Sequence, residues 1–252
     1  MNIIERLRPP LLLRSLRRRG RDLLLRASDQ EDLATFREDL ARRYLSGDGI
    51  EIGALHLPLR VPKRARVRYV DVMTREQLIA AYSIDVYDNP LWVVETDILD
   101  DGERLGTVAD HTLDFVIANH MLEHTEDPIA TLEHFVRVLR PGGTLFLTLP
   151  DARHTFDALR PRTTVEHLLR DHREGPEVSR EEHYREWAVV ECLPPDRIAA
   201  RVAEFGRDGT RHHFHVWELP HFLEFLAAVA LPLELELAQQ HLHEFAVILR
   251  RG

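Results

Sequence analysis

Histidines are concentrated in the second half of this 252-residue sequence, where fourteen of the fifteen lie after residue 110. His120, Glu123 and His124 span a single turn, so their side chains can converge on one point. Imidazole and carboxylate groups at this spacing can bind a divalent cation, or a histidine can act as a general base toward a poorly nucleophilic hydroxyl. Further candidates stand later in the chain, at His154, His212, His213 and His215.

The elements that must position these groups alternate between strands and helices. Asp127 and Pro128 form a typical helix start, and the residues 141–143, Pro-Gly-Gly, end that helix. A nearly continuous apolar run at 113–118 is typical of a central parallel strand. The alternation predicts a parallel sheet with helices on both faces. The expected strands are 50–53, 67–70, 91–94, 113–118 and 144–149, with helices at 28–44, 74–82 and 127–139.

The alternation of strands and helices stops after the fifth strand. Residues 151–215 are polar and rich in histidine, and we expect helices there, for instance at 164–171 and 180–190. A helix at 219–230 and two antiparallel strands at 233–237 and 245–249 then complete the chain. The predicted architecture is an α/β fold with a seven-stranded, mostly parallel Rossmann-like sheet, an antiparallel C-terminal strand pair and a largely helical insertion. We expect an N-terminal helical arm over 1–46 and one domain over 47–252, with 151–215 as a lid on the substrate side.

Charge is distributed unevenly. Residues 1–26 carry eight arginines against Glu5 and Asp22, a net charge of +6, so the remainder carries −15 of the overall −9. An acidic body argues against a nucleic-acid partner. The arm could lie on an anionic membrane as a peripheral contact, or pack on the body or on a second copy in a homodimer, and we favour packing. The sequence has no apolar run long enough for a membrane span. Its single cysteine, Cys192, excludes a disulfide framework and fits a cytoplasmic location.

Ligands of open α/β sheets bind at the carboxyl ends of the strands. An acidic residue closing the second strand, Asp71, suits the two hydroxyls of a ribose. Asp97 followed by Ile98 suits an adenine, because the carboxylate can accept a hydrogen bond from the exocyclic amine while the aliphatic chain covers the ring. Both a dinucleotide and S-adenosylmethionine (SAM) contain these groups. The remaining candidates at this edge are Glu51, Gly53, Asn119 and His120.

The loop after the first strand indicates which of these two ligands, a dinucleotide or SAM, the site can bind. A pyrophosphate needs several glycines and a helix N-terminus directly after the strand. The loop has Gly53 alone, and Pro58 and Pro62 stand in a link too short for a full helix. Because SAM carries no phosphate, the sequence favours SAM.

Several segments together resemble the class I SAM-dependent methyltransferases of the type 11/23 kind. They are residues 49–54 (GIEIGA), 96–98 (TDI), 113–124 (LDFVIANHMLEH) and 137–146 (RVLRPGGTLF), within the region 47–150. The last two segments in combination are the more specific. One departure is that Leu55 and Leu57 replace the later glycines usual in the first segment.

The resemblance implies roles for individual residues. Glu51 would organise the loop at the methionyl end, and Gly53 would let the backbone approach the ligand. Asp71 would hold the ribose. Asp97 and Ile98 would hold the adenine, while Asn119 and His120 would flank the sulfonium and its methyl group.

Activation of the acceptor has two alternatives. A histidine among His120, His124 and His154 could act as general base. Alternatively, His120, Glu123 and His124 could hold Mg²⁺ or Mn²⁺ together with a histidine of the insertion, as similar Glu-His pairs do in one RNA-terminal branch of the family. For other polar and aromatic residues we favour structural roles, with ion pairing for Arg153 and Arg160 and core packing for Trp187, Trp217 and Phe214.

The resulting expectation is a SAM-dependent O-methyltransferase acting on a small polar acceptor, with a saccharide hydroxyl first. One alternative is methylation of a lipid-like or aromatic metabolite, with the basic arm touching a membrane. Another is a SAM-fold subunit that binds without turnover.

Overall fold

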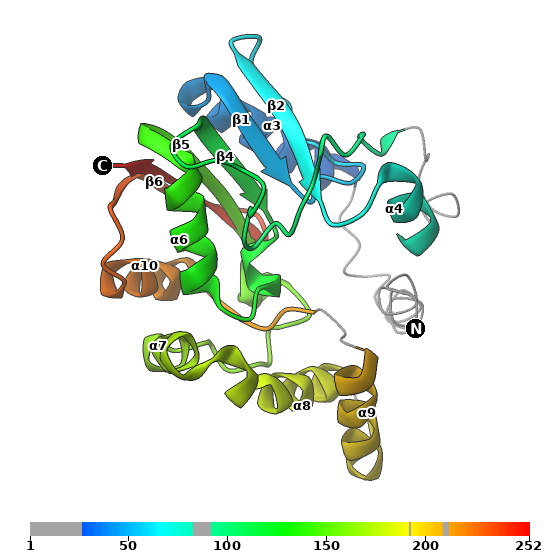
Figure 1. Ribbon diagram of the computed structural model, residues 1–252. Coiled ribbons are helices and arrows are strands. Elements are labelled where there is room, and N and C mark those ends of the chain that lie inside the picture. Colours follow the sequence, from blue (N-terminus) through cyan, green and yellow to red (C-terminus); the bar gives the residue numbers. More distant parts are fainter. Residues whose placement is uncertain (1–26, 83–91, 192, 209–211) are drawn as a thin grey trace.

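The structure is a computed structural model that describes residues 27–82, 92–191, 193–208 and 212–252 (Figure 1). The basic arm of residues 1–26 and Cys192 lie outside the described residues, so the interpretations placed on them stay predictions. Among the described helices, none is both long and apolar enough to cross a membrane.

Seven strands form one sheet in the order β3-β2-β1-β4-β5-β7-β6. The pairs from β3 through β5 are parallel, whereas β7 runs antiparallel to both β5 and β6. This arrangement confirms the predicted fold class, including the C-terminal strand pair. The strands are β1 (Gly47–Ile52), β2 (Ala65–Asp71), β3 (Ile98–Leu99), β4 (Leu113–Asn119), β5 (Leu139–Pro150), β6 (Leu233–His241) and β7 (Glu244–Arg251).

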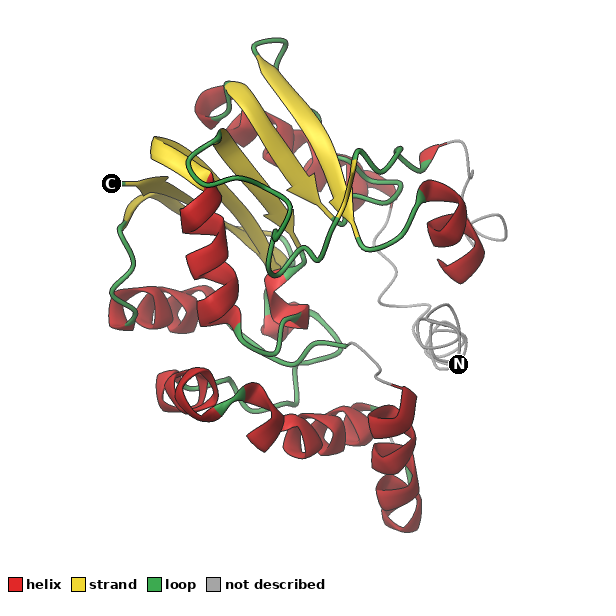
Figure 2. Ribbon diagram, in the orientation of Figure 1, coloured by secondary structure: helices red, strands yellow, loops and turns green. Residues whose placement is uncertain are grey.

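Helices cover both faces of the sheet (Figure 2). On one face lies α3 (Ala27–Tyr44), and on the other lie α6 (Pro128–Val138) and α10 (Leu219–Ala228). Because side chains alternate along a strand, Phe115 and Ile117 of β4 pack toward α3 in one apolar cluster, whereas Val116 packs in the other cluster with α6 and α10. The segment 53–64, between β1 and β2, contains no helix, as its prolines predict.

The third strand differs from its predicted position. The strand lies at Ile98–Leu99, and the described residues 92–94 belong to no strand. The apolar side chain of Val93 instead packs in a small cluster with Met73 and with Leu78 of α4 (Arg75–Tyr82). Val93 is therefore buried against α4 while Trp92 is exposed, and the strand expected at 91–94 was wrong over its described residues 92–94. As a consequence, Asp97 precedes β3.

The insertion after β5 is largely helical in its described residues. It contains α7 (Val165–Glu174), α8 (Arg180–Val190) and α9 (Pro195–Asp208), which lie beyond the carboxyl edge of the sheet (Figure 1). The first two confirm predicted helices, whereas α9 was not predicted. A separate apolar cluster joins Trp187 of α8 to Phe205 of α9 and to Phe214. Trp217 belongs to the main core instead, so all three aromatic residues assigned to packing are buried.

Candidate functional site

Three neighbouring strands are tied together at their carboxyl ends by a polar network. Asn119, at the end of β4, donates from Nδ2 to Oε1 of Glu51 (3.2 Å) and accepts at Oδ1 from the hydroxyl of Thr148 (2.9 Å). The fully buried Glu51 carboxylate also accepts from the backbone N–H of Leu59 at 3.0 Å. Burial raises the pKa of Glu51 to about 7, although these hydrogen bonds favour the ionised form. Glu51 therefore fixes the loop that follows β1.

Gly53 begins that loop with φ +65°, a conformation that glycine adopts without strain. Its N–H donates to the carbonyl of Val70 at 3.0 Å, and a Cβ built on it would face open space. The backbone is therefore open on this side, as an approaching ligand would require.

Asp71 ends β2 at the same edge of the sheet. Its Oδ1 accepts from the backbone N–H of Met73 at 3.3 Å, which leaves acceptor capacity on the carboxylate. Burial raises the pKa of Asp71 to about 6. The carboxylate can accept two hydroxyls of a ligand, provided that it is ionised.

Asp97 does not reach this edge. Because it precedes β3, its exposed carboxylate accepts from the backbone N–H of Tyr69 at 2.8 Å, within the length of β2. Ile98 lies in the strand itself and packs against the main core. The structure thus directs Asp97 to the backbone of β2 because of the shifted position of β3, whereas Ile98 pairs with Val70, next to Asp71.

The residues that follow β3 are Asp100 and Asp101, which were not among the predicted site residues. The N–H of Asp100 donates to the carbonyl of Asp71 at 3.0 Å, so the two loops lie side by side. A Cβ on Gly102 would come within 2.4 Å of Cγ2 of Ile52, so glycine lets this loop lie against the end of β1. The signal in the sequence that could have identified these two residues is the run Asp-Asp-Gly, which begins two residues after Ile98.

His120 directly follows β4 and has φ +49°, a backbone conformation that is uncommon for residues other than glycine. Its backbone N–H donates to the carbonyl of Thr148 at 2.8 Å. On the ring, Nε2 lies 2.8 Å from Oε2 of Glu244, the first residue of β7. Arg37 of α3 donates to both oxygens of the same buried carboxylate.

Charge in this group fixes the proton positions. Burial alone would raise the pKa of Glu244, but the hydrogen bonds from Arg37 and His120 outweigh it and lower that pKa to about 2. An ionised carboxylate only accepts hydrogen bonds, so Nε2 of His120 must carry a proton and donate to Glu244. In this tautomer the lone pair of the imidazole is on Nδ1. His120 is held as a potential base and does not contribute Nε2 to a metal site.

A second group forms just beyond, around the 3-10 turn η3 (Leu122–His124). Glu123 is fully buried, and neither carboxylate oxygen has a hydrogen-bond partner. Nε2 of His124 and Nε2 of His213 each lie 4.0 Å from its Oε1. Burial raises the pKa of Glu123. One donor atom from each of the three side chains lies within 4.8 Å of the others, an arrangement that fits a cation.

His213 comes from the insertion and reaches Glu123 because the chain there returns to the sheet. The N–H of Phe214 donates to the carbonyl of Glu123 at 2.8 Å. Nδ1 of His213 lies 2.6 Å from Oδ2 of Asp157, so this nitrogen donates and Nε2 presents its lone pair. A carboxylate behind a histidine is typical of metal sites. The predicted group of His120, Glu123 and His124 is therefore divided. Glu123 and His124 lie close to His213, whereas His120 pairs with Glu244.

The remaining candidates are His154 and two arginines, of which Arg160 borders the His213 group through Asp157. His154 is exposed in the turn η4 (Ala152–His154). Arg160 is buried and pairs with Asp157 at 2.8 Å and with Glu186 at 2.9 Å, and Arg153 pairs with Asp151. Both arginines are neutralised, which confirms their structural interpretation.

The strand order, the antiparallel final pair and the acidic residues at the carboxyl edge define a class I SAM-dependent methyltransferase fold. The sequence model of the methyltransferase-domain family Methyltransf_23 matches residues 26–191, more than half of the chain. The chain belongs to this family, which confirms the resemblance based on motifs. No curated protein matches the sequence.

Similar solved structures are distant in sequence. A SAM-dependent methyltransferase from Aquifex aeolicus is 13% identical over the full length of both chains, with a TM-score of 0.45. A protein from Pyrococcus horikoshii OT3 is 14% identical, with 92% of this chain and 94% of that chain covered and a TM-score of 0.49. The N-methyltransferase NodS from Bradyrhizobium japonicum WM9 is 13% identical, with coverages of 90% and 98% and a TM-score of 0.43.

Proposed function

We propose that the protein is a SAM-dependent O-methyltransferase that methylates a hydroxyl of a small polar acceptor, with a saccharide as the first candidate, with the help of a divalent cation. The observation that carries this proposal is the Glu123 carboxylate, buried without a hydrogen-bond partner between His124 and His213. A buried carboxylate with no partner is costly, and a bound cation would compensate it.

On the cofactor side, SAM supplies the methyl group and a good leaving group. The residues of this chain bind and orient it. Asp71 would accept the ribose hydroxyls, and Asp101 is better placed than Asp97 to accept the adenine amine, because its loop lies against the end of β1. Glu51 and Asn119 would shape the methionyl end through the network that joins β1, β4 and β5.

On the acceptor side, one carboxylate and two imidazoles, completed by ligand oxygens, fit Mn²⁺ and fit Mg²⁺ less well, because magnesium prefers oxygen ligands. A cation there would lower the pKa of a coordinated hydroxyl, which is a poor nucleophile at neutral pH. Asp157 would hold the ring of His213 in the ligating orientation.

The nature of the acceptor follows from what surrounds His213. The ring of Phe156 lies 4.8 Å from the ring of His213 and is 41% exposed, so it offers an apolar surface on which a sugar can stack. Arg153 and Arg160 are neutralised by carboxylates, which favours an uncharged acceptor over an anionic one.

A metal-free mechanism is the second candidate, and the pair His120–Glu244 favours it. Glu244 orients the ring by accepting from Nε2, which leaves Nδ1 free to take a proton from the acceptor hydroxyl. Both mechanisms lead to the same product, and only the first requires a metal.

The product of the reaction tests the proposal. The purified protein is incubated with SAM carrying a ¹³C-labelled methyl group and with sugars, phenols, lipid-like alcohols and amines. We expect a methyl ether on a sugar, identified by its ¹³C chemical shift, and loss of turnover in Asp71→Asn. A product in the phenol or lipid-like set would favour the alternative acceptor and a role of residues 1–26 at a membrane. An N-methyl product would contradict the proposal. Binding of S-adenosylhomocysteine without any turnover would indicate a non-catalytic subunit.

A further inference from the structure

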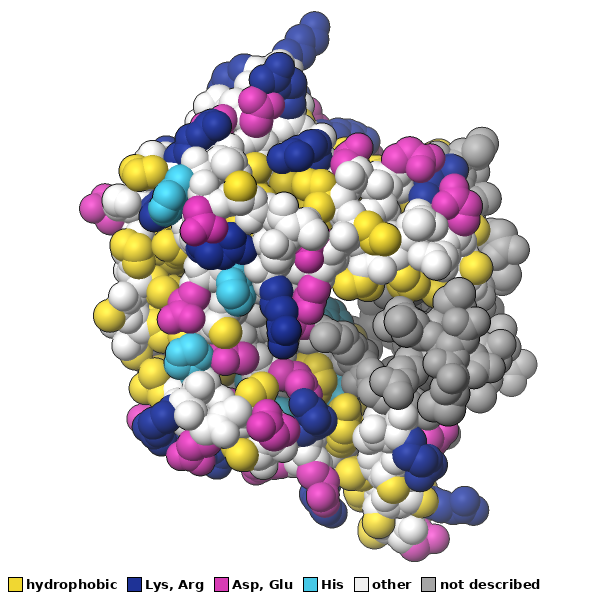
Figure 3. Space-filling model, viewed as in Figure 1, with side chains coloured by type: hydrophobic (Ala, Val, Ile, Leu, Met, Phe, Trp, Pro, Cys, Tyr) yellow, Lys and Arg dark blue, Asp and Glu magenta, His cyan; other side chains and the backbone are white. Residues whose placement is uncertain are grey.

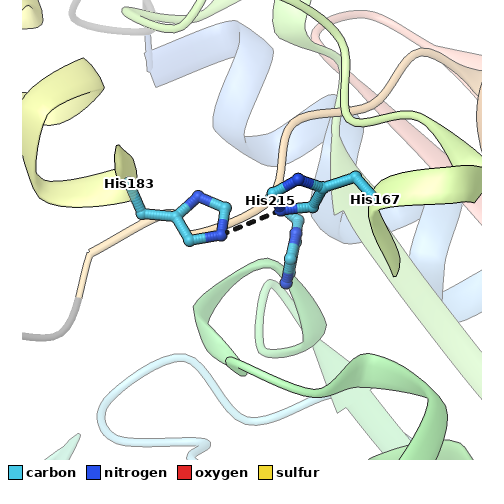
Figure 4. Close-up of side chains that lie close together, drawn as sticks. All are labelled: His167, His183 and His215. Carbon is cyan, nitrogen blue, oxygen red and sulfur yellow. Dashed lines mark hydrogen bonds between the residues drawn. The ribbon is translucent and has the colours of Figure 1, made fainter. Parts of the chain in front are cut away.

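A second cluster of metal-binding side chains lies within the insertion, apart from the site described above. His167 belongs to α7, His183 to α8, and His215 to the segment that returns to the sheet (Figure 4). One ring nitrogen from each lies within 4.8 Å of the others. Asp171, one turn after His167 on the same face of α7, adds a buried carboxylate.

The distances among the donor atoms of His167, His183 and Asp171 are close to those of a tetrahedral site. Nε2 of His167 lies 3.1 Å from Nε2 of His183, and Oδ2 of Asp171 lies 3.0 Å from the former and 3.8 Å from the latter. A tetrahedral zinc site with bonds of about 2.0–2.1 Å holds its ligand atoms about 3.3 Å apart. Oδ2 of Asp171 is buried and has no hydrogen-bond partner despite these short distances. The donor atoms are therefore close together without forming hydrogen bonds to Oδ2 of Asp171, as expected of ligands around a shared cation.

The atoms behind the cluster hold two of its members in a ligating state. Nε2 of His215 lies 3.2 Å from the carbonyl oxygen of Glu126, to which it can only donate, so Nδ1 keeps a lone pair, and this buried Nδ1 has no partner. Oδ1 of Asp171 accepts from the hydroxyl of Ser179 at 2.5 Å, which orients the carboxylate. Such outer partners are typical of metal sites.

One contact must change when a metal binds. Nη2 of Arg170 lies 3.2 Å from Nδ1 of His167, which must carry a proton if Nε2 is a ligand. The side chain of Arg170 is 41% exposed and also donates to Ser179 at 2.6 Å, so it can give up this contact and remain bonded.

We propose that His167, His183, His215 and Asp171 form a structural Zn²⁺ site that joins α7 and α8 to the returning segment. Three imidazole nitrogens and one carboxylate oxygen suit zinc better than magnesium or calcium, which prefer oxygen ligands. The site would hold the insertion in the position at which the backbone N–H groups of Phe214 and His215 meet the carbonyl of Glu123 in η3, so that His213 lies against Glu123.

Cobalt absorption tests this site without a methyl donor or an acceptor, so its outcome is independent of the proposed function. The full-length protein is stripped with EDTA, dialysed and titrated with Co²⁺. We expect intense visible bands of tetrahedral cobalt that Zn²⁺ abolishes at one equivalent, and a higher melting temperature with zinc. A folded wild-type protein that gives no tetrahedral bands would overturn the proposal.

Variants assign the bands to these side chains. His183→Gln and Asp171→Asn should each weaken cobalt binding by about 100-fold or more, because they remove a ligand. His172→Gln, on the same helix but outside the cluster, should leave the spectrum unchanged. His213→Gln should also retain the bands, and if it abolishes them the metal lies at Glu123 and the proposal fails. Should the two ligand variants not fold, bands that survive His213→Gln still assign the metal to the insertion.

Discussion

Nε2 of His120 donates to Oε2 of Glu244 across 2.8 Å, and this bond joins the exit of β4 to the first residue of β7. Arg37 of α3 completes the group from the other side. The helix, the central strand and the last strand are therefore fixed relative to one another at the edge of the sheet where the candidate site lies. The same contact sets the tautomer of the imidazole nearest the expected position of the methyl group.

This group should make stability depend on pH. The folded-state pKa of Glu244 is lowered to about 2 from the usual 4.5, so its contribution is fully present above pH 4.5 and is lost as the pH falls from 4.5 toward 2. We expect Glu244→Gln to lower the free energy of unfolding by about 3 kcal/mol at pH 7, measured by urea denaturation, and this difference should shrink at low pH.

Glu236→Gln is the matched control. Glu236 pairs with Arg250 at a half-exposed position on the neighbouring strand β6, where an ion pair contributes only about 0–1 kcal/mol. Equal effects of the two substitutions at pH 7 would show that the Glu244 group has no special role in stability.

Binding of the cofactor should depend on Asp71 and not on Asp97. Loss of charge-assisted bonds to the ribose in Asp71→Asn should weaken S-adenosylhomocysteine binding by about 1.5–3 kcal/mol, measured by calorimetry. Asp97→Asn should change affinity little, since its carboxylate binds the backbone of Tyr69. A larger loss in Asp97→Asn than in Asp71→Asn would refute this placement of the site.

The pH dependence of the same binding follows from the environment of Asp71. Burial raises the pKa of its carboxyl to about 6, and only the ionised form accepts both hydroxyls. Affinity for S-adenosylhomocysteine should therefore be constant above about pH 7 and fall below pH 6, approaching tenfold per pH unit. A flat profile between pH 5 and 8 would argue against a ribose at Asp71.

Removal of the charge of Glu123 and removal of the charge of Asp157 should change the stability of the metal-free protein in opposite directions. The raised pKa of Glu123 reports a buried charge without partners that destabilises the folded state at neutral pH, so Glu123→Gln should stabilise the protein by about 1–3 kcal/mol. Asp157 is paired with His213 and Arg160, so Asp157→Asn should destabilise it by about 2–4 kcal/mol. Thermal unfolding in EDTA compares the two. Destabilisation by both would mean that Glu123 has a structural partner.

The sequence predicted the sheet well because its strands carry strong local signals. The runs at β4 and β5 are apolar on both faces, and Asp127 caps α6 by accepting from the N–H of Ala130 at 3.0 Å, as expected. The predicted position of β3 was wrong because a strand of two residues is too short to show an apolar pattern. The more apolar segment at 92–94 contributes Val93 to the cluster with α4 instead.

The candidate site was only partly accessible to sequence reasoning, because its partners are far apart along the chain. His120 and Glu244 are separated by 124 residues, and no local spacing connects them. The expectation that a histidine of the insertion would join Glu123 and His124 agrees with the position of His213. The sequence alone could not distinguish His213 from its neighbours His212 and His215. That choice depends on how the insertion returns to η3.

The most direct test of the central claim is the metal dependence of methyl transfer from labelled SAM to the best sugar acceptor. With a cation at Glu123, His124 and His213, dialysis against EDTA should abolish turnover, and Mn²⁺ or Mg²⁺ should restore it in the wild type but not in Glu123→Gln. If turnover persists unchanged in EDTA and in Glu123→Gln, yet falls by about 10²–10⁴-fold in His120→Ala, the metal account is contradicted and the pair His120–Glu244 is the base.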